Sequence, residues 1–321
     1  MGSMADYQTL IYYKYTKLPN AEEFAQEHLQ FCKELGLVGR VLIGYEGING
    51  TVSGTKEQCR QYMDHLKHQP AFEGITFKVD DVAKFSFAKM HVRFRDEIVA
   101  FDLNEEEDVD PNVESGQHLE PGKFRELKDR DDVVVLDVRN KLETDVGKFK
   151  NAKTLNIDQF RDFPQHIDEL EPYKDKKIIA YCTGGIRCEK ATAYLKRKGF
   201  NDVYQLNGGI INYYKKTGGE DFEGQCYVFD RRITVNVNDV NPNVISTCEV
   251  CGTETTKLIN CANPECNKHF IICENCANER EGCCSKECQQ HPRKRYYDGS
   301  GFYMKGLETL RQKEQEAESW P

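Results

Sequence analysis

The stretch that most constrains the fold is IIAYCTGGIRC, residues 178–188. Its apolar beginning predicts a buried strand, and the residues that follow it have the composition of a helix. Between them, Cys182 opens a six-residue loop that ends at Arg187. A cysteine placed between a strand and a helix N-terminus, with loop amides around it, is typical of a site that holds an anionic sulfur.

The loop residues themselves favour a thiolate at Cys182. Backbone N–H groups, the dipole of the following helix and the Arg187 guanidinium all attract negative charge. Gly184 and Gly185 permit the positive φ angles that turn N–H groups inward. A buried cysteine can also be a small core residue, but the composition of this loop indicates that Cys182 is a reactive cysteine. The candidate catalytic residues are therefore Cys182, Thr183, Gly184, Gly185, Ile186 and Arg187.

Strands and helices alternate on both sides of this loop, which predicts a parallel sheet covered on both faces. The expected strands are 133–139, 152–157, 176–182 and 202–210. Ligands bind at the carboxyl ends of such strands, which is also where Asp137 and Arg139 fall, so we expect both to support the site. Cys188, in the first turn of the helix, is either a redox partner for Cys182 or a packing residue.

The flanking segments predict further domains. Residues 4–101 have the order β-α-β-β-α-β, which indicates a ferredoxin-like α+β domain. Residues 102–116 are acidic and turn-rich and read as a linker, and 117–222 form the α/β domain. Residues 223–321 begin with an expected strand at 226–237, continue as a cysteine-rich region, and end in a polar helical tail at about 303–318.

One strand of the N-terminal domain has a basic face. In AKMHVRFRD the basic groups alternate with apolar ones, so period two places them together. These groups are Lys89, His91, Arg93 and Arg95. They suit a phosphate backbone, although a solvated sheet face gives the same pattern. Arg293, Lys294 and Arg295, beside two tyrosines, form a second candidate nucleic-acid contact.

Cysteines are concentrated near the C-terminus: nine of the fourteen lie between Cys248 and Cys288. With no export signal at the start of the chain, this pattern indicates metal or redox chemistry rather than disulfides. Thiolate pairs two residues apart can share one tetrahedral metal. The expected ligands of two structural zinc ions are Cys248, Cys251, Cys273 and Cys276 for one, and Cys261, Cys266, Cys288 and either Cys283 or Cys284 for the other.

Other arrangements of this cluster stay open. The pairs could bind metal side by side rather than interleaved, His269 or His291 could replace a cysteine, and the thiols could be reduced or partly disulfide-bonded. Few large apolar residues lie in this segment, so a metal is the expected source of its folding energy.

The loop and the segments around it resemble a known family. CTGGIRCEKA, with Asp137-Val138-Arg139 on the earlier strand, resembles the rhodanese domain; together with EGINGTVSG, KMHVRFRDEIV and CYVFDRR it resembles the bacterial rhodanese-related tRNA uridine hydroxylases. The resemblance implies oxygen-dependent formation of 5-hydroxyuridine at the wobble position, the tRNA anticodon arm as partner, and Cys182 as a persulfide-bearing cysteine. The six-residue loop is the sulfurtransferase length, so phosphatase activity is not expected.

Composition limits the remaining functions. The net charge of −9 argues against a generally basic nucleic-acid coat, so RNA contacts must be local. The sequence contains no apolar run long enough to predict a membrane span, and no flavin or nicotinamide fingerprint is present. We expect a cytoplasmic enzyme. The alternatives are a sulfurtransferase that uses thiosulfate or a persulfide, and a non-enzymatic zinc-dependent binding module. The oligomeric state stays open.

Overall fold

The computed structural model describes residues 6–104 and 106–303, and the chain divides into two compact units. The N-terminal unit comprises the described residues through Asn104 together with Pro111–Val113. The C-terminal unit comprises the rest, through Tyr303. The helix expected at 303–318 lies, apart from its first residue, outside the described residues.

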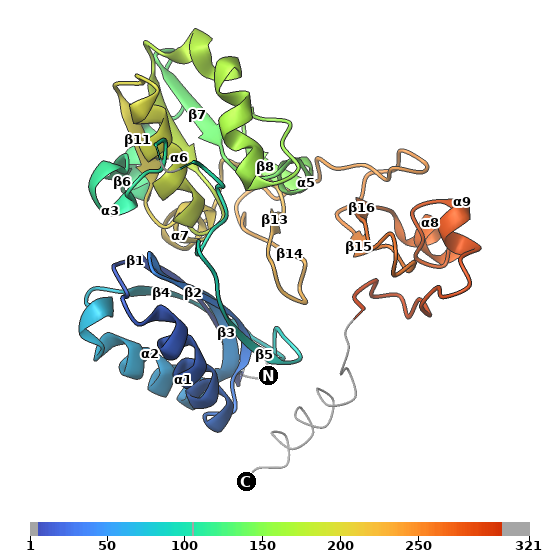
Figure 1. Cartoon of the computed structure of the whole chain (residues 1–321). Helices are drawn as coiled ribbons and strands as arrows, with labels where there is room; N and C mark the ends of the chain where they lie inside the picture. The colour runs from blue at the N-terminus through green and yellow to red at the C-terminus, as the bar shows by residue number, and fades with distance from the viewer. Residues whose placement is uncertain (1–5, 105, 304–321) are drawn as a thin grey trace. The chain divides into compact units, whose positions relative to one another are not determined.

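The N-terminal unit is built on one five-stranded sheet (Figure 1). Its elements are β1 Tyr7–Tyr15, α1 Ala21–Glu34, β2 Val38–Gly44, β3 Gly47–Thr55, α2 Lys56–Lys67, a 3₁₀ turn Pro70–Phe72, β4 Thr76–Val82 and β5 Met90–Phe94. The strand order is β4-β1-β3-β2-β5. The first four strands pair antiparallel, whereas β5 pairs parallel to β2. The expected ferredoxin-like arrangement is confirmed, with β5 as an additional edge strand.

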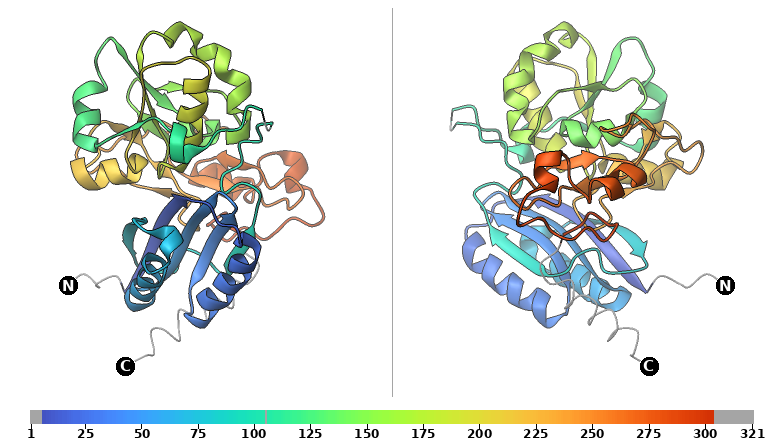
Figure 2. Two further views of the ribbon diagram at one scale, coloured as in Figure 1. Left: turned by 60° about the vertical axis from the view of Figure 1, so that its left-hand side comes forward. Right: turned by 90° about the vertical axis from the view of Figure 1, so that its right-hand side faces the viewer.

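Both helices of this unit cover the same face of the sheet (Figure 2). Alternate strand residues such as Leu10, Val41 and Val92 point to that side and form one core with the helices. The residues between them, including Arg40, His91 and Arg93, are exposed on the opposite face. The alternation seen in the sequence therefore separates an apolar face from a basic one, as expected.

The C-terminal unit contains a second five-stranded sheet, of order β6-β11-β10-β7-β9 with every pairing parallel. Its elements are β6 Gln117–Leu119, α4 Pro121–Leu127, β7 Val133–Asp137, α5 Lys141–Val146, β9 Lys153–Thr154, a 3₁₀ segment Phe160–Tyr173, β10 Lys177–Tyr181, α6 Ile186–Arg197, β11 Val203–Leu206 and α7 Gly209–Thr217. The central strand β10 is buried on both sides from Ile178 onward, because helices cover both faces. The expected parallel α/β sheet is confirmed.

The acidic segment before this sheet carries a short helix, α3 Pro111–Glu114. Its last residue, Glu114, accepts hydrogen bonds from Arg197 at 2.8–3.0 Å, and Glu107 accepts one from Lys198 at 2.6 Å. Part of the acidic charge is thus used to bind the end of α6.

The prediction of a single strand at 226–237 is wrong. Its two ends form a hairpin instead, β13 Cys226–Tyr227 and β14 Thr234–Val235, with a turn that contains Phe229. Asp230 accepts a backbone hydrogen bond from Arg232 at 2.9 Å and also binds its guanidinium, which stabilises the turn. No pattern in the sequence indicated this reversal.

The remaining elements of the C-terminal unit are short. They are β8 Gly147–Phe149 paired with β12 Phe222–Gly224, β15 Leu258–Asn260 paired with β16 His269–Ile271, α8 Glu274–Glu279 and α9 Lys286–Gln289. None of the helices in the described ranges is long and apolar enough to cross a membrane.

Candidate active site

The candidate active-site loop connects β10 to α6. Cys182 is the first residue after the strand, only 1% of its surface is exposed, and its Sγ accepts the N–H of Gly185 at 3.1 Å. Gly185 has φ 106°, a conformation that favours glycine. Gly184 is not among the described glycines with positive φ, so only one of the two expected loop glycines has this role.

The surroundings of Cys182 favour its thiolate. Burial raises the pKa of this thiol, but a hydrogen bond from Cys188, the charge of Arg187 and backbone N–H groups of the loop lower the pKa to about 5. The sulfur is therefore anionic at neutral pH. The Cys188 thiol keeps its proton, because burial and the neighbouring Cys182 sulfur raise its pKa well above the ordinary value.

Arg187 interacts with a carboxylate as well as with the Cys182 sulfur, because it forms a buried ion pair with Glu143. Its two terminal nitrogens donate to the carboxylate at 2.6 and 2.8 Å, and one also lies 3.5 Å from the Thr183 hydroxyl. Glu143 was not a candidate from the sequence. The spacing of Asn140 and Glu143 is that of a capping box at the start of α5, which indicates a helix start but not a partner for Arg187.

The N-terminus of α7 holds the other side of the loop. Ile210 N–H donates to the Cys182 carbonyl at 3.0 Å, and Ile211 N–H donates to the Thr183 carbonyl at 3.2 Å. A side chain at Gly209 would place its Cβ 2.4 Å from the Cys182 carbonyl oxygen, and this residue has φ 66°. A glycine at this position is thus needed to fix the loop.

Asp137, the last residue of β7, and Arg139 form a fully buried pair. The guanidinium donates to the carboxylate at 2.6 and 2.9 Å and to the Gly147 carbonyl at 2.6 Å. The rings of Tyr181 and Phe222 lie 5.7 and 5.8 Å from it. Because both residues have no exposed surface, this pair is a contact of the domain's interior, and its support of the site stays a prediction.

A third cysteine, Cys226 on β13, contacts the loop. It hydrogen-bonds Thr183, and burial raises the pKa of its thiol to about 12, so it stays protonated. Its position in CYVFDRR gave no sign of this contact, because it depends on the hairpin that the sequence did not predict.

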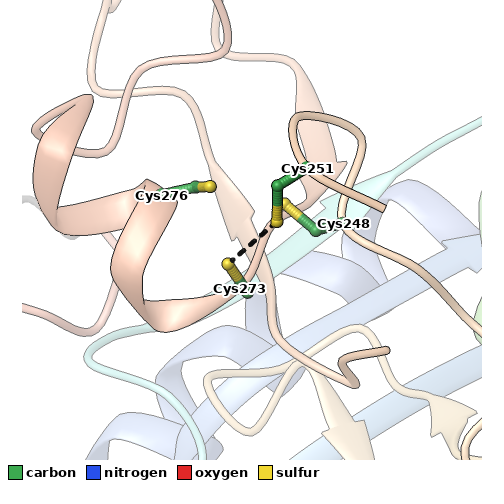
Figure 3. A group of neighbouring side chains, drawn as sticks. All are labelled: Cys248, Cys251, Cys273 and Cys276. Carbon is green, nitrogen blue, oxygen red and sulfur yellow. Dashed lines mark hydrogen bonds between the residues drawn. The ribbon is translucent and has the colours of Figure 1, made fainter. Parts of the chain in front are cut away.

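Eight sulfurs of the cysteine-rich region gather in two groups of four. Figure 3 shows Cys248 and Cys251 facing Cys273 and Cys276; the second group is Cys261, Cys266, Cys284 and Cys288. Within each group all four sulfurs lie within 4.8 Å of one another. Three of the sulfur–sulfur separations within the groups are 3.6 to 3.8 Å, which fits the edge of about 3.8 Å for four thiolates around one zinc.

The grouping is interleaved and uses Cys284 rather than Cys283. Burial raises the pKa of the Cys283 thiol to about 12, and its sulfur belongs to neither group. His269 lies 3.3 Å from the Tyr227 hydroxyl and His291 lies 3.2 Å from Glu265, so neither histidine replaces a cysteine. The two groups have the geometry of closed metal sites.

The candidate RNA-binding residues have two different environments. Lys89, His91, Arg93 and Arg95 are exposed in the N-terminal unit, where Arg40 on β2 lies opposite His91. Burial and the neighbouring charges of Arg93, Arg40 and Lys89 lower the pKa of His91, so the cationic groups of this face are Arg40, Lys89, Arg93 and Arg95. The sequence did not point to Arg40, because its strand lacks the basic alternation of β5.

The second basic set is bound within the cysteine-rich region. Arg293 pairs with Glu265 and Lys294 pairs with Glu281. Arg295 donates to the carbonyls of Cys261 and Ala262. This region therefore uses all three residues to hold its own backbone and carboxylates.

Comparisons with known proteins agree with this architecture. Residues 7–98 match the UPF0176 acylphosphatase like domain, 120–216 the Rhodanese-like domain, and 223–289 the family described as Rhodanase C-terminal. The chain is 54% identical to a tRNA uridine(34) hydroxylase of Cytophaga hutchinsonii, over 95% of this chain and 96% of the relative. It is 50% identical to that of Staphylococcus carnosus (91% and 92% covered) and 46% identical to that of Bacillus licheniformis (98% and 99%). The resemblance noted in the sequence is thus confirmed, and the chain belongs to the tRNA uridine(34) hydroxylase family.

Proposed function

We propose that this protein is an oxidoreductase that hydroxylates C5 of uridine 34 in tRNA, with molecular oxygen as the oxidant. The observation that carries the proposal is the anionic Cys182 sulfur, hydrogen-bonded by a second thiol, in a chain that matches proteins named tRNA uridine(34) hydroxylases over nearly its whole length. A cytoplasmic enzyme follows from a tRNA substrate.

The balance of electrons requires a two-electron donor besides uridine, and the two neighbouring cysteines can supply it. Replacing the C5–H bond by C5–OH removes two electrons from uridine, whereas reducing oxygen to the product oxygen and water requires four. The other two come from two thiols that become a disulfide: uridine, oxygen and two thiols give hydroxyuridine, water and one disulfide. Cys188 touches Cys182 and keeps its proton, so these two residues form the dithiol.

The loop residues act on the sulfur of Cys182, whether it is a thiolate or carries a persulfide. The Gly185 N–H donates to it, and the backbone from Thr183 to Ile186 encloses it. Arg187 adds positive charge while Glu143 holds its orientation. In this role Cys182 and Cys188 react, and the other residues of the loop stabilise the anion.

We further propose that each group of four cysteines holds one zinc ion. Thiolate ligands at every position leave no open site for a substrate. The ions would fix short elements that have few apolar side chains between them. Their role is therefore structural.

The anticodon arm would bind the basic face of the N-terminal unit. Arg40, Lys89, Arg93 and Arg95 suit a phosphate backbone, and no ion pair of Arg40 or Arg93 is present among the residues that the structure describes. Arg293, Lys294 and Arg295 already bind groups of their own region. We therefore assign the first RNA contacts to the N-terminal unit.

Nucleoside mass spectrometry tests the activity. Purified enzyme, unmodified tRNA, air and dithiothreitol should yield 5-hydroxyuridine, and Cys182→Ala should yield none. Absence of the product with wild-type enzyme that contains its metal and binds tRNA would refute the proposal.

A sulfurtransferase is the second candidate, favoured by the six-residue loop with its N–H bond to the Cys182 sulfur. A thiosulfate–cyanide assay, with Cys182→Ser as the control, separates the two functions. Thiocyanate formation by wild-type enzyme that forms no 5-hydroxyuridine would favour the second candidate.

A further inference from the structure

A pocket of about 540 Å³ opens at the start of α5 within the C-terminal unit, and its lining residue Glu143 connects it to Arg187 of the active-site loop. This volume is in the ~300–1,000 Å³ range of small-ligand pockets. Its walls come from the start of α5, from the turn that follows β13, and from residues next to β16. The Rhodanese-like domain and the cysteine-rich region thus both contribute to it.

One wall of the pocket is aromatic. The rings of Tyr227 and Phe229 lie 5.0 Å apart at 81°, and Tyr227 also holds His269 through a 3.3 Å contact of its hydroxyl. Phe229 is 53% exposed, although Tyr227 beside it is buried. The contact with the buried Tyr227 ring holds Phe229, and the exposed part of the Phe229 ring offers apolar surface to a ligand.

The same ring touches the active-site ion pair. The Arg187 guanidinium carbon lies 5.7 Å from the centre of the Phe229 ring. Glu143, which binds Arg187, lines the pocket and lies 3.5 Å from the Thr183 hydroxyl. A ligand against Phe229 would therefore lie next to groups that contact the Cys182 loop.

The charges of the pocket do not favour a phosphate as its occupant. Its two lysines are already in ion pairs, Lys141 with Asp145 and Lys268 with Glu249, and Glu143 is paired with Arg187. Asp158 adds a further negative charge to the lining. A phosphate would find no free positive charge among these lining residues, whereas a neutral base needs none. Uracil donates from N3–H and accepts at O2 and O4, so carboxylates and a lysine match its edge.

We propose that this pocket receives the unstacked base of the target uridine and that Phe229 is its stacking platform. A base must leave the stack of its neighbours before a side chain can reach C5, and single-stranded RNA bases are commonly held on aromatic rings. The inference rests on the proposed function and names the part of the site that binds the reacting base. Phe229 contacts substrate in this role, whereas Tyr227 positions it.

The test is a binding cycle with two RNAs, an anticodon stem-loop that carries uridine 34 and the same stem-loop with an abasic site there. Wild-type protein should bind the uridine RNA about 5- to 100-fold more tightly, the range expected for one stacked base. Phe229→Ala should bind both RNAs equally, and Phe229→Trp should restore the preference. Tyr45→Ala, which removes an exposed ring from the N-terminal unit, is the matched control and should keep the wild-type ratio.

The inference is overturned if Phe229→Ala keeps the preference for the uridine RNA, including the case in which it weakens the binding of both RNAs by the same factor. It is also overturned if the wild-type protein binds the two RNAs alike. Metal content and circular dichroism show that each variant is folded, and Phe229→Trp keeps the test decisive if the alanine variant is not. Because binding needs no turnover, a missing 5-hydroxyuridine product with an intact binding preference would refute the hydroxylase proposal alone.

Discussion

Arg187 and Glu143 form a buried ion pair with two hydrogen bonds of 2.6 and 2.8 Å between the active-site loop and α5. The arginine thus contributes its charge to the Cys182 sulfur while a carboxylate balances it. Glu143 also lines the neighbouring pocket, so one side chain connects the thiolate loop to the space where we place the base.

Breaking this pair should destabilise the protein. Glu143→Gln leaves the Arg187 charge buried without its carboxylate, which typically costs about 3–5 kcal/mol. Arg187 lowers the pKa of Glu143 against the opposing effect of burial. The ion pair therefore contributes fully to the free energy of unfolding above the ordinary carboxyl pKa, and this contribution is lost as the pH falls through the lowered pKa of Glu143 in the folded protein. Urea unfolding at neutral and acid pH measures both effects.

The control for that experiment is Glu171→Gln. Glu171 pairs with Lys174 at 2.9 Å, but the pair is largely exposed, so we expect little change in unfolding free energy. Equal stabilities of the Glu143 and Glu171 variants would show that the buried pair is not an important contact.

The pKa of Cys182 makes its reactivity depend on pH in a defined direction. Its thiolate fraction should rise with pH through a midpoint near 5, so iodoacetamide labelling of its peptide should reach half its maximal rate there. The Cys226 peptide, whose thiol has a pKa of about 12, provides the control in the same digest. Cys188→Ala removes a hydrogen bond to the thiolate and should move the midpoint upward by about 1–2 pH units; an unchanged midpoint would contradict the contact.

How much of this site is visible in the sequence depends on the range of the interactions. The buried strand β10, the loop and α6 follow one another along the chain, so local pattern and turn chemistry predict them. The spacing of the cysteines likewise predicts metal binding, because each pair comes from one short turn. The parallel sheet follows from the alternation of strands and helices.

The residues that were missed come from distant segments. Glu143 meets Arg187 across 44 positions of sequence, and no local pattern indicates such a pair. Arg40 joins the basic face only through the parallel pairing of β2 with β5. Phe229 reaches the site because Asp230 and Arg232 turn the chain within a segment that we expected to form one continuous strand.

The two cysteine groups predict different metal contents for neighbouring substitutions. Cys284→Ser should lose about one of two zinc ions per chain and lower the thermal stability, because its sulfur belongs to a group of four. Cys283→Ser should keep both ions, since its sulfur lies outside the groups. Plasma mass spectrometry of the purified variants measures the ratio of zinc to protein. If Cys283→Ser lost one ion and Cys284→Ser kept both, Cys283 rather than Cys284 would be the ligand.

The basic face of the N-terminal unit predicts a salt-dependent contribution to RNA binding. Arg93→Ala should weaken binding of the anticodon stem-loop and reduce the slope of log K against log salt by about one. Arg60→Ala is the matched control, because this exposed arginine of α2 is already paired with Glu57 and Asp64. Equal slopes for both variants and the wild type would move the RNA contact away from this face.

The pairing of Cys182 with Cys188 predicts the outcome of a single turnover without added thiol. Each wild-type molecule should form at most one 5-hydroxyuridine, and its Cys182 and Cys188 peptides should be recovered as one disulfide, because the two thiols supply the electrons that oxygen requires beyond those from uridine. Cys188→Ser should also form at most one product per molecule under these conditions, because oxidation of the Cys182 thiol to a sulfenic acid supplies two electrons. Its Cys182 peptide should then carry one added oxygen and no disulfide, and further turnovers should require dithiothreitol. Cys32→Ser removes a thiol that is also buried but lies in the core of the N-terminal unit, and it should behave as the wild type does. Product formed by Cys188→Ser without thiol while its Cys182 sulfur stays unoxidised, or more than one product per molecule, would mean that the electrons come from another donor.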